Sequence, residues 1–247
     1  GAKNLFADQL VGFSLITGTS GTGNSINLTL DANLNNAAYQ AMAGRKGVVA
    51  LYNYQTGEVL CMLSTPSFDP ADDAEVAKVA AGDSNYDGAY LNRFLSGTYT
   101  PGSTFKLVTS AAALETLHNE NSFSYTCKGS LTLNGEKITC PSVHGTQDFA
   151  TALANSCNGA FATLATQVGG KTLEKYAQEA GLTSKVNVNG LNSAAGNFTA
   201  GTSDNDVGWS GVGQYKDLVN PCAELTLMGC IAQGGSAATP RLLKSVT

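Results

Sequence analysis

Long apolar runs and charge are both scarce in this sequence. No run of about 18 apolar residues occurs, and the N-terminus lacks the basic and apolar segments of a secretory signal, so we expect the chain as given to be soluble. Charged residues make up only 13% and form no long block of one sign, which argues against a disordered tail. The formal net charge of -5 argues against a basic surface for nucleic acid, so nucleic acid is not an expected partner.

Short metal-ligand spacings are missing as well. No Cys-x-x-Cys or His-x-x-x-His occurs among the six cysteines and two histidines. The histidines, His118 and His144, have no cluster of metal-ligand residues beside them in the sequence. We therefore expect no metal site and no cofactor.

One pair of cysteines is a candidate disulfide. Cys127 and Cys140 flank the segment 131–138, which is typical of two short strands around an Asn134-Gly135 turn. Such a hairpin brings the two cysteines close together. A bond between them would stabilise the fold by about 3 kcal/mol and would indicate an oxidising compartment. The alternative is a pair of reduced cysteines packed in a core.

The length and the local patterns indicate a compact domain with strands first and helices after them. A chain of 247 residues suits one large domain or two closely packed lobes. Strands are expected at 26–30, 47–54 and 59–64, and helices at 31–44, 103–117, 171–180 and 221–233. The stretch 190–213 is rich in Gly, Ser, Asn and Thr and is typical of a long loop.

A serine and a lysine one helical turn apart form the strongest candidate site. The spacing of Ser103 and Lys106 places both side chains on one face of a helix, where they can share a proton. A lysine whose pKa is lowered by burial and by the helix start can remove the serine proton. Backbone N–H groups at the helix start can stabilise an oxyanion. The plain alternative is a helix cap with a surface lysine, but the apolar residues around Lys106 favour burial.

The residues around this pair resemble a known motif. Pro-Gly-Ser-Thr-Phe-Lys at 101–106, preceded by Asn92-Arg93 and Gly97-Thr-Tyr99, resembles the nucleophile motif of the penicillin-binding transpeptidases. The resemblance continues in chain order through most of the sequence. It is carried by 28–34, 47–51, 56–58, 64–70, 213–214, Pro221 and 232–235, ahead of Pro240.

The second motif of that family, Ser-x-Asn, has three literal matches, at 25–27, 156–158 and 203–205. The match at 203–205 lies in the expected loop and too far beyond Ser103 for the family. The match at 156–158 lies between two helical segments and carries the flanking residues of the family. The resemblance implies that Ser156 passes a proton toward the leaving amine. It implies that Asn158 hydrogen-bonds Lys106 and the substrate amide oxygen, while Cys157 packs away from the site.

The third motif, Lys-Thr-Gly, does not occur, since the one Lys-Thr pair, at 171–172, is followed by leucine. The resemblance implies an α/β, β-lactamase/transpeptidase-like fold in which a sheet lobe packs on an all-helical lobe. We expect residues 1–247 to be a single, incomplete transpeptidase domain with its C-terminal strands missing. The sheet lobe is then 26–68 plus 221–247, and the helical lobe is approximately 69–220.

The resemblance also implies a function. Ser103 would attack the terminal D-Ala-D-Ala bond of a peptidoglycan stem peptide, release D-alanine and pass the acyl group to an amine of a second stem peptide, during cell division or elongation. β-Lactam antibiotics would acylate the same serine. The implied partners are the stem peptide, β-lactams and other cell-wall synthesis proteins. The implied location is the extracytoplasmic face of the bacterial cell membrane, with an anchoring N-terminal segment that is not present in this chain.

Two other functions stay open at this point. A β-lactam sensor domain and a class D β-lactamase share Ser-Thr-Phe-Lys, but both usually carry Ser-x-Val as the second motif, which Asn158 does not match. A non-catalytic cell-wall scaffold would explain the missing third motif. Covalent labelling of Ser103 by a fluorescent penicillin separates the three readings.

Overall fold

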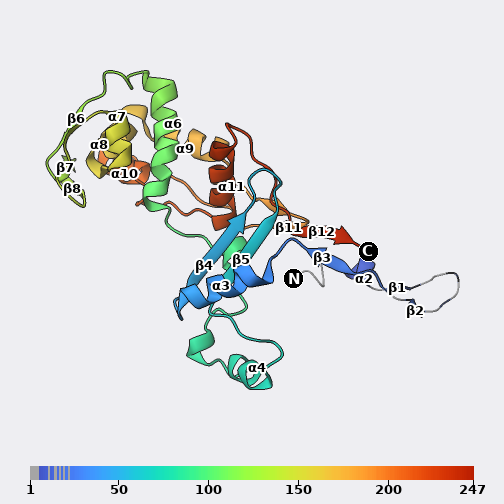
Figure 1. The fold of residues 1–247 in the computed structure, drawn as a ribbon. Coiled ribbons are helices and arrows are strands. Elements are labelled where there is room, and N and C mark those ends of the chain that lie inside the picture. Colours follow the sequence, from blue (N-terminus) through green and yellow to red (C-terminus); the bar gives the residue numbers. More distant parts are fainter. Residues whose placement is uncertain (1–5, 11, 14–15, 17, 19, 22) are drawn as a thin grey trace. The chain divides into compact units, whose positions relative to one another are not determined.

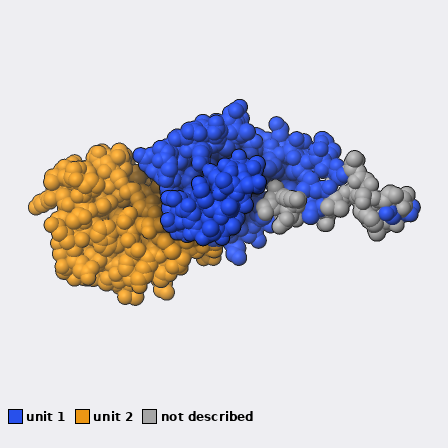
Figure 2. All heavy atoms as spheres, turned by 90° about the horizontal axis from the view of Figure 1, so that it is seen from below, with its two compact units in different colours: residues 1–97, 185–194, 220–247 blue, residues 98–184, 195–219 orange. Residues whose placement is uncertain are grey.

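The computed structural model describes residues 6–10, 12–13, 16, 18, 20–21 and 23–247 (Figure 1). These residues form two compact units, each assembled from separate stretches of the chain (Figure 2). Unit 1 consists of the described residues of 1–97, together with 185–194 and 220–247. Unit 2 consists of 98–184 and 195–219.

Unit 1 is built around antiparallel strand pairs and the helices that accompany them. Its elements are α2 (Ala7–Leu10), β1 (Gly12–Phe13), β2 (Ser20–Gly21), β3 (Ile26–Leu28), α3 (Ala32–Met42), β4 (Gly47–Tyr52), β5 (Val59–Thr65), α4 (Asp73–Ala80), η1 (Ser84–Tyr86), α5 (Arg93–Ser96), β10 (Asn187–Val188), β11 (Leu191–Asn192), α11 (Pro221–Ala232) and β12 (Leu243–Val246). β4 pairs with β5, β12 with β3, β1 with β2 and β10 with β11. The predicted hairpin at 47–64 is confirmed, and the side chain of Asp31 caps α3 by accepting the N–H groups of Asn33 and Leu34.

Asn220 joins two elements of unit 1 at its buried core. Its side chain is fully buried, and Nδ2 donates to the carbonyls of Phe94, Leu95 and Gly97. Its Oδ1 accepts the first free N–H groups of α11, where Pro221 stands at the first turn. The same side chain therefore starts α11 and holds the end of α5 against it.

Unit 2 is mostly helical but also contains two small sheets. Its elements are η2 (Gly102–Phe105), α6 (Lys106–Leu117), β6 (Tyr125–Cys127), β7 (Ser130–Leu133), β8 (Glu136–Thr139), β9 (Gly145–Gln147), α7 (Phe149–Ala154), α8 (Asn158–Val168), α9 (Gly170–Glu179) and α10 (Asp204–Gly211). Its core is centred on α8, whose residues Ala160, Phe161 and Leu164 are fully buried. The predicted α/β fold class is confirmed, with one correction: the helical lobe is not all-helical, because β6 pairs with β9 and β7 with β8.

The β7–β8 hairpin follows the sequence prediction closely. Leu133 pairs with Glu136, and the two residues between them, Asn134 and Gly135, have φ angles of 49° and 82°. Two consecutive positive φ values are the signature of the tight turn that suits the twist of antiparallel strands. This turn fixes the register of the hairpin.

Two further differences from the sequence prediction concern the boundaries of the lobes and the expected loop at 190–213. Residues 69–97 and 185–194, which were expected in the helical lobe, lie in unit 1, because Phe94 and Val188 are buried in its core. The stretch 190–213 is not one loop, since it contains α10. In the described part of the chain, none of the helices has the length and apolar character needed to cross a membrane.

Candidate active site

The turn that carries Ser103 is held by close backbone packing within unit 2. Gly102 has φ +60° and its N–H donates to the carbonyl of Gly213 at 2.9 Å. Gly213 has φ +76°, and a Cβ atom at this position would overlap the carbonyl oxygen of Gly102. After this turn the chain passes through the 3-10 helix η2 into α6, which begins at Lys106. Ser103 is exposed, whereas Lys106 is only 1% exposed.

The amine of Lys106 is the centre of the site. Its Nζ lies 3.1 Å from Ser103 Oγ, 2.8 Å from Ser156 Oγ, 2.7 Å from the Ser156 carbonyl and 2.7 Å from Asn158 Oδ1. Two of these four partners are carbonyl oxygens, which can only accept, and two are hydroxyls, which can also donate. A neutral amine has two N–H groups and one lone pair. Its N–H groups can therefore satisfy the two carbonyls while its lone pair faces a hydroxyl.

Burial favours that neutral form. Desolvation of the Lys106 side chain lowers its pKa to about 8, although the nearby Cys140 and Cys157 act in the opposite direction. The ring of Phe161 lies beside the amine, with its centroid 5.8 Å from Nζ. At neutral pH a useful fraction of this lysine is therefore uncharged, as a general base requires.

Ser156 reaches the amine through an unusual backbone conformation. It lies between α7 and α8 with φ 50°, which is uncommon for a residue with a side chain. This conformation turns both its carbonyl and its hydroxyl toward Lys106. Its hydroxyl also donates to Ser103 Oγ at 2.8 Å, so the two serines and the lysine form one hydrogen-bonded ring. Strain held by several contacts of this kind is a feature of functional sites.

Asn158 is fixed by the β7–β8 hairpin. It opens α8, and its Nδ2 donates to the carbonyl of Thr139 at the end of β8, at 2.8 Å. This contact sets which way the side-chain amide points, so that Oδ1 faces Lys106. The next residue, Gly159, donates its N–H to Cys140 Sγ at 3.2 Å. Neither hairpin contact was foreseen from the sequence, which holds no local signal for them.

The structure brings the four predicted catalytic residues, Ser103, Lys106, Ser156 and Asn158, into one network. The other two Ser-x-Asn matches have different roles. Ser203 is the N-cap of α10 and accepts the N–H of Asp206. Asn27 lies on β3 in unit 1, where its Nδ2 donates to Ser245.

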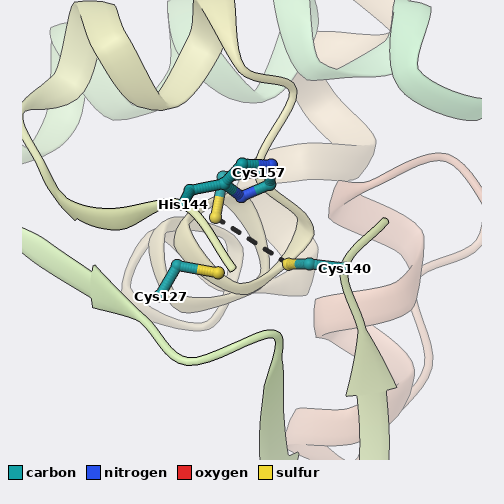
Figure 3. A group of neighbouring side chains, drawn as sticks. All are labelled: Cys127, Cys140, His144 and Cys157. Atoms are coloured by element: carbon teal, nitrogen blue, oxygen red, sulfur yellow. Dashed lines mark hydrogen bonds between the residues drawn. The ribbon is translucent and has the colours of Figure 1, made fainter. Parts of the chain in front are cut away.

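The expectation for the cysteines needs correction. All six cysteines are free, so the candidate bond between Cys127 and Cys140 is not formed in this structure. His144 has no ligand cluster beside it in the sequence, but the fold brings it next to Cys127, Cys140 and Cys157. Figure 3 shows these four side chains gathered in one place. Cys157 is fully buried, as expected, and its Sγ lies 3.8 Å from that of Cys140.

Several solved structures and curated proteins are similar to this chain in fold and in sequence. The peptidoglycan D,D-transpeptidase PbpA of Mycobacterium tuberculosis is 29% identical over 99% of this chain and 53% of its own length. Stage V sporulation protein D of Bacillus subtilis is 36% identical over 58% of this chain and 21% of its own length. The penicillin G acyl-enzyme complex of penicillin-binding protein A from M. tuberculosis has 28% identity and a TM-score of 0.79, over 95% of this chain and 58% of that one.

These relatives are longer proteins, and this chain spans about half the length of the PbpA relatives that it matches. Residues 47–247 also match the family model of the penicillin binding protein transpeptidase domain. That match covers most of the sequence and includes all four residues of the Lys106 network. The chain therefore belongs to the penicillin-binding protein transpeptidase family.

Proposed function

We propose that this chain carries the acyl-transfer site of a peptidoglycan D,D-transpeptidase, with Ser103 as the nucleophile and Lys106 as its base. The observation that carries the proposal is the contact set of the Lys106 amine, which is buried, has a lowered pKa and faces the Ser103 hydroxyl. A weak nucleophile next to a partly neutral base is the arrangement that covalent catalysis needs. The family and the names of the relatives support the same reaction.

In the first step Ser103 Oγ attacks the carbonyl carbon of the penultimate D-alanine, and its proton moves to the neutral amine of Lys106. The backbone N–H of Ser103, at the first turn of η2 where helical N–H groups lack helical acceptors, is suited to bind the oxyanion that forms. Collapse of the tetrahedral intermediate breaks the C–N bond. The products are an acyl-Ser103 ester and the amine of D-alanine.

The leaving amine needs a proton, and Ser156 is placed to transfer it. Its hydroxyl lies within hydrogen-bond distance of both Lys106 Nζ and Ser103 Oγ, so a proton taken by the lysine can pass through this hydroxyl to the departing nitrogen. In the second step an amine of another stem peptide attacks the ester, and Ser103 recovers its proton. Asn158 holds the lysine and is suited to bind the substrate amide.

Partners and location follow from the same proposal. The relatives in M. tuberculosis are solved as acyl-enzyme complexes with imipenem and penicillin G, so we infer that β-lactams acylate Ser103 here. A PBP2–MreC complex is known from Helicobacter pylori, a relative with 22% identity, and other cell-wall proteins are proposed as partners on family grounds alone. The proposed stem-peptide substrate supports a location at the extracytoplasmic face of the cell membrane.

The pH dependence of acylation tests the role of Lys106. Because the amine must be neutral to accept a proton, and its pKa is about 8, the acylation rate is expected to rise with pH through about 8. Between about pH 7 and pH 9 the increase is about tenfold, since the neutral fraction rises by that factor. Rapid-mixing kinetics with a chromogenic β-lactam measure it. A rate that stays flat across this range contradicts the role of lysine as base.

Covalent labelling tests the proposed nucleophile. A fluorescent penicillin is expected to attach once per chain, to the peptide that contains Ser103, and to remain attached for minutes or longer. Ser103→Ala is expected to abolish the label. The matched control is Ser203→Ala, at the unused Ser-x-Asn, which should label within about twofold of the parent rate because a lost helix cap costs only about 1 kcal/mol of stability. Mass spectrometry of the digested adduct identifies the modified residue.

Three outcomes would count against this proposal. Folded protein that takes no label would favour a scaffold, and label that survives in Ser103→Ala would place the chemistry elsewhere. Label that is released within seconds would favour a β-lactamase. The transfer step is measured separately, by following D-alanine release and the mass of the cross-linked product from a synthetic pentapeptide and an acceptor amine.

A further inference from the structure

Three thiols and one imidazole lie close together next to the Ser156-Cys157-Asn158 segment of the candidate site. The ligand atoms of Cys127, Cys140, His144 and Cys157 all lie within 4.8 Å of one another (Figure 3). They come from four different elements or their ends: the last residue of β6, the residue after β8, the residue before β9 and the N-cap of α8. From this geometry we propose that unit 2 contains a Zn²⁺ site of the Cys₃His type, formed by these four residues.

The spacing of the sulfur atoms fits a tetrahedral thiolate centre. Sulfur atoms bound to zinc at about 2.3 Å in a tetrahedron stand about 3.8 Å apart. The Sγ atoms of Cys140 and Cys157 are 3.8 Å apart. A disulfide requires a sulfur separation of about 2.05 Å, so this pair is placed for a shared ion and not for a bond to each other. The ligand atoms of Cys127 and His144 complete the group, in which no two ligand atoms are more than 4.8 Å apart.

The burial of the cluster leaves its polar atoms in need of a partner. Cys127 is 1% exposed and Cys157 is fully buried. His144 Nδ1 is buried and has no hydrogen-bond partner among the described residues. A buried ring nitrogen without a partner destabilises the folded state, whereas a bond to a metal ion satisfies it. Three thiolates and one imidazole are the donor set that favours Zn²⁺ over the oxygen-seeking ions Mg²⁺ and Ca²⁺.

Backbone groups around the cluster are directed at its sulfur atoms. The N–H of Gly129 donates to Cys127 Sγ at 3.4 Å, and that of Gly159 donates to Cys140 Sγ at 3.2 Å. Hydrogen bonds of this kind favour the thiolate over the thiol and orient the sulfur, as the outer contacts of metal ligands do. With four protein ligands the centre would have no open position, so its role would be structural and not catalytic.

Such an ion would brace the second motif directly. Cys157 lies between Ser156 and Asn158, and Cys140 follows Thr139, whose carbonyl holds the Asn158 amide. One ion would tie the start of α8 to the end of the hairpin that positions it. This consequence rests on the proposed function: zinc removal is expected to slow acylation of Ser103 through loss of positioning. Metal binding itself does not depend on that function.

Metal analysis of the purified chain tests the site without reference to activity. The protein is prepared in a phosphine reductant, equilibrated with equimolar ZnCl₂ and passed through a desalting column. We expect about one zinc per chain, with X-ray absorption showing three sulfur neighbours near 2.3 Å and one nitrogen near 2.0 Å. Cys127→Ser and Cys157→Ser are expected to lower the retained zinc by at least tenfold. Cys230→Ser, in α11 of unit 1, is the control that should retain it.

A second measurement covers variants that fail to fold. A strong zinc chelator added to the unaltered, folded chain is expected to lower its melting temperature by several degrees, because an ion that binds only the folded state stabilises it. The proposal is overturned if the reduced chain retains no more zinc than Cys127→Ser, or if absorption shows oxygen neighbours in place of sulfur. It is also overturned if Cys127 and Cys140 form a disulfide that persists after treatment with the phosphine reductant.

Discussion

Replacement of Lys106 by glutamine is expected to slow acylation of Ser103 by a β-lactam by about 10³-fold, within the range typical for loss of a positioned general base. The side-chain amide of glutamine is one bond shorter than the lysine side chain but keeps two N–H donors directed toward Asn158 Oδ1 and the Ser156 carbonyl, which the amine contacts at 2.7 Å. It has no basic lone pair to accept the Ser103 proton. The substitution therefore removes the proton transfer and keeps N–H donors next to the two half-buried carbonyls.

The residual reaction of Lys106→Gln carries a second signature. Its rate should no longer rise through pH 8, because that rise comes from the lysine pKa. The matched control is Lys171→Gln, which alters an exposed lysine at the start of α9 in the same unit and should leave the rate unchanged. Acylation of a folded Lys106→Gln protein within tenfold of the parent rate would be incompatible with lysine as the base.

A buried aspartate in unit 2 is expected to make stability depend on pH. Asp217 is 1% exposed, and neither carboxylate oxygen has a hydrogen-bond partner among the described residues. Burial raises its pKa to about 7, from a model-compound value of 3.8. A raised folded-state pKa means that the folded protein holds the proton more tightly than the unfolded chain. The resulting stabilisation is complete below pH 3.8 and is lost as pH rises through about 7.

Asp217→Asn is expected to remove this dependence. From about pH 5 to pH 8, the free energy of unfolding of the parent should fall by roughly 2 to 3 kcal/mol relative to that of the variant, because only the parent loses the proton. Urea titrations at the two pH values give the difference. Asp204→Asn, an exposed residue in the first turn of α10, is the control and should change the pH dependence by a few tenths of a kcal/mol at most. Parallel pH curves for parent and Asp217→Asn would refute the assignment.

The sequence predicted the parts of the site that depend on local spacing. Ser103 and Lys106 are one helical turn apart, and the apolar residues around them indicated burial. The choice of 156–158 among three Ser-x-Asn matches depended on flanking residues. The Thr139 carbonyl could not be predicted in the same way, because its place beside Asn158 depends on the hairpin register and on how α8 packs against it.

The missed helix α10 and the cysteine cluster have physical explanations as well. Glycines lower helix propensity, yet in α10 they allow close packing on α8: a Cβ at Gly211 would overlap the Cβ of Ala165. Tertiary contact therefore outweighs composition there. The four residues of the cluster follow no standard metal spacing along the chain, and only the folded hairpin brings Cys127 and Cys140 near His144 and Cys157.

The β7–β8 hairpin also determines which changes in chain length the site can accept. Successive carbonyls of a strand point in opposite directions, so deletion of one residue between Gly135 and Thr139 would present an N–H where Asn158 now finds an oxygen. Deletion of two residues would restore the direction. Extra residues between Asn134 and Gly135 would lengthen the turn and leave the pairing of β8 with β7 unchanged. Length variation in this segment should therefore be confined to the tip or occur in even steps along β8.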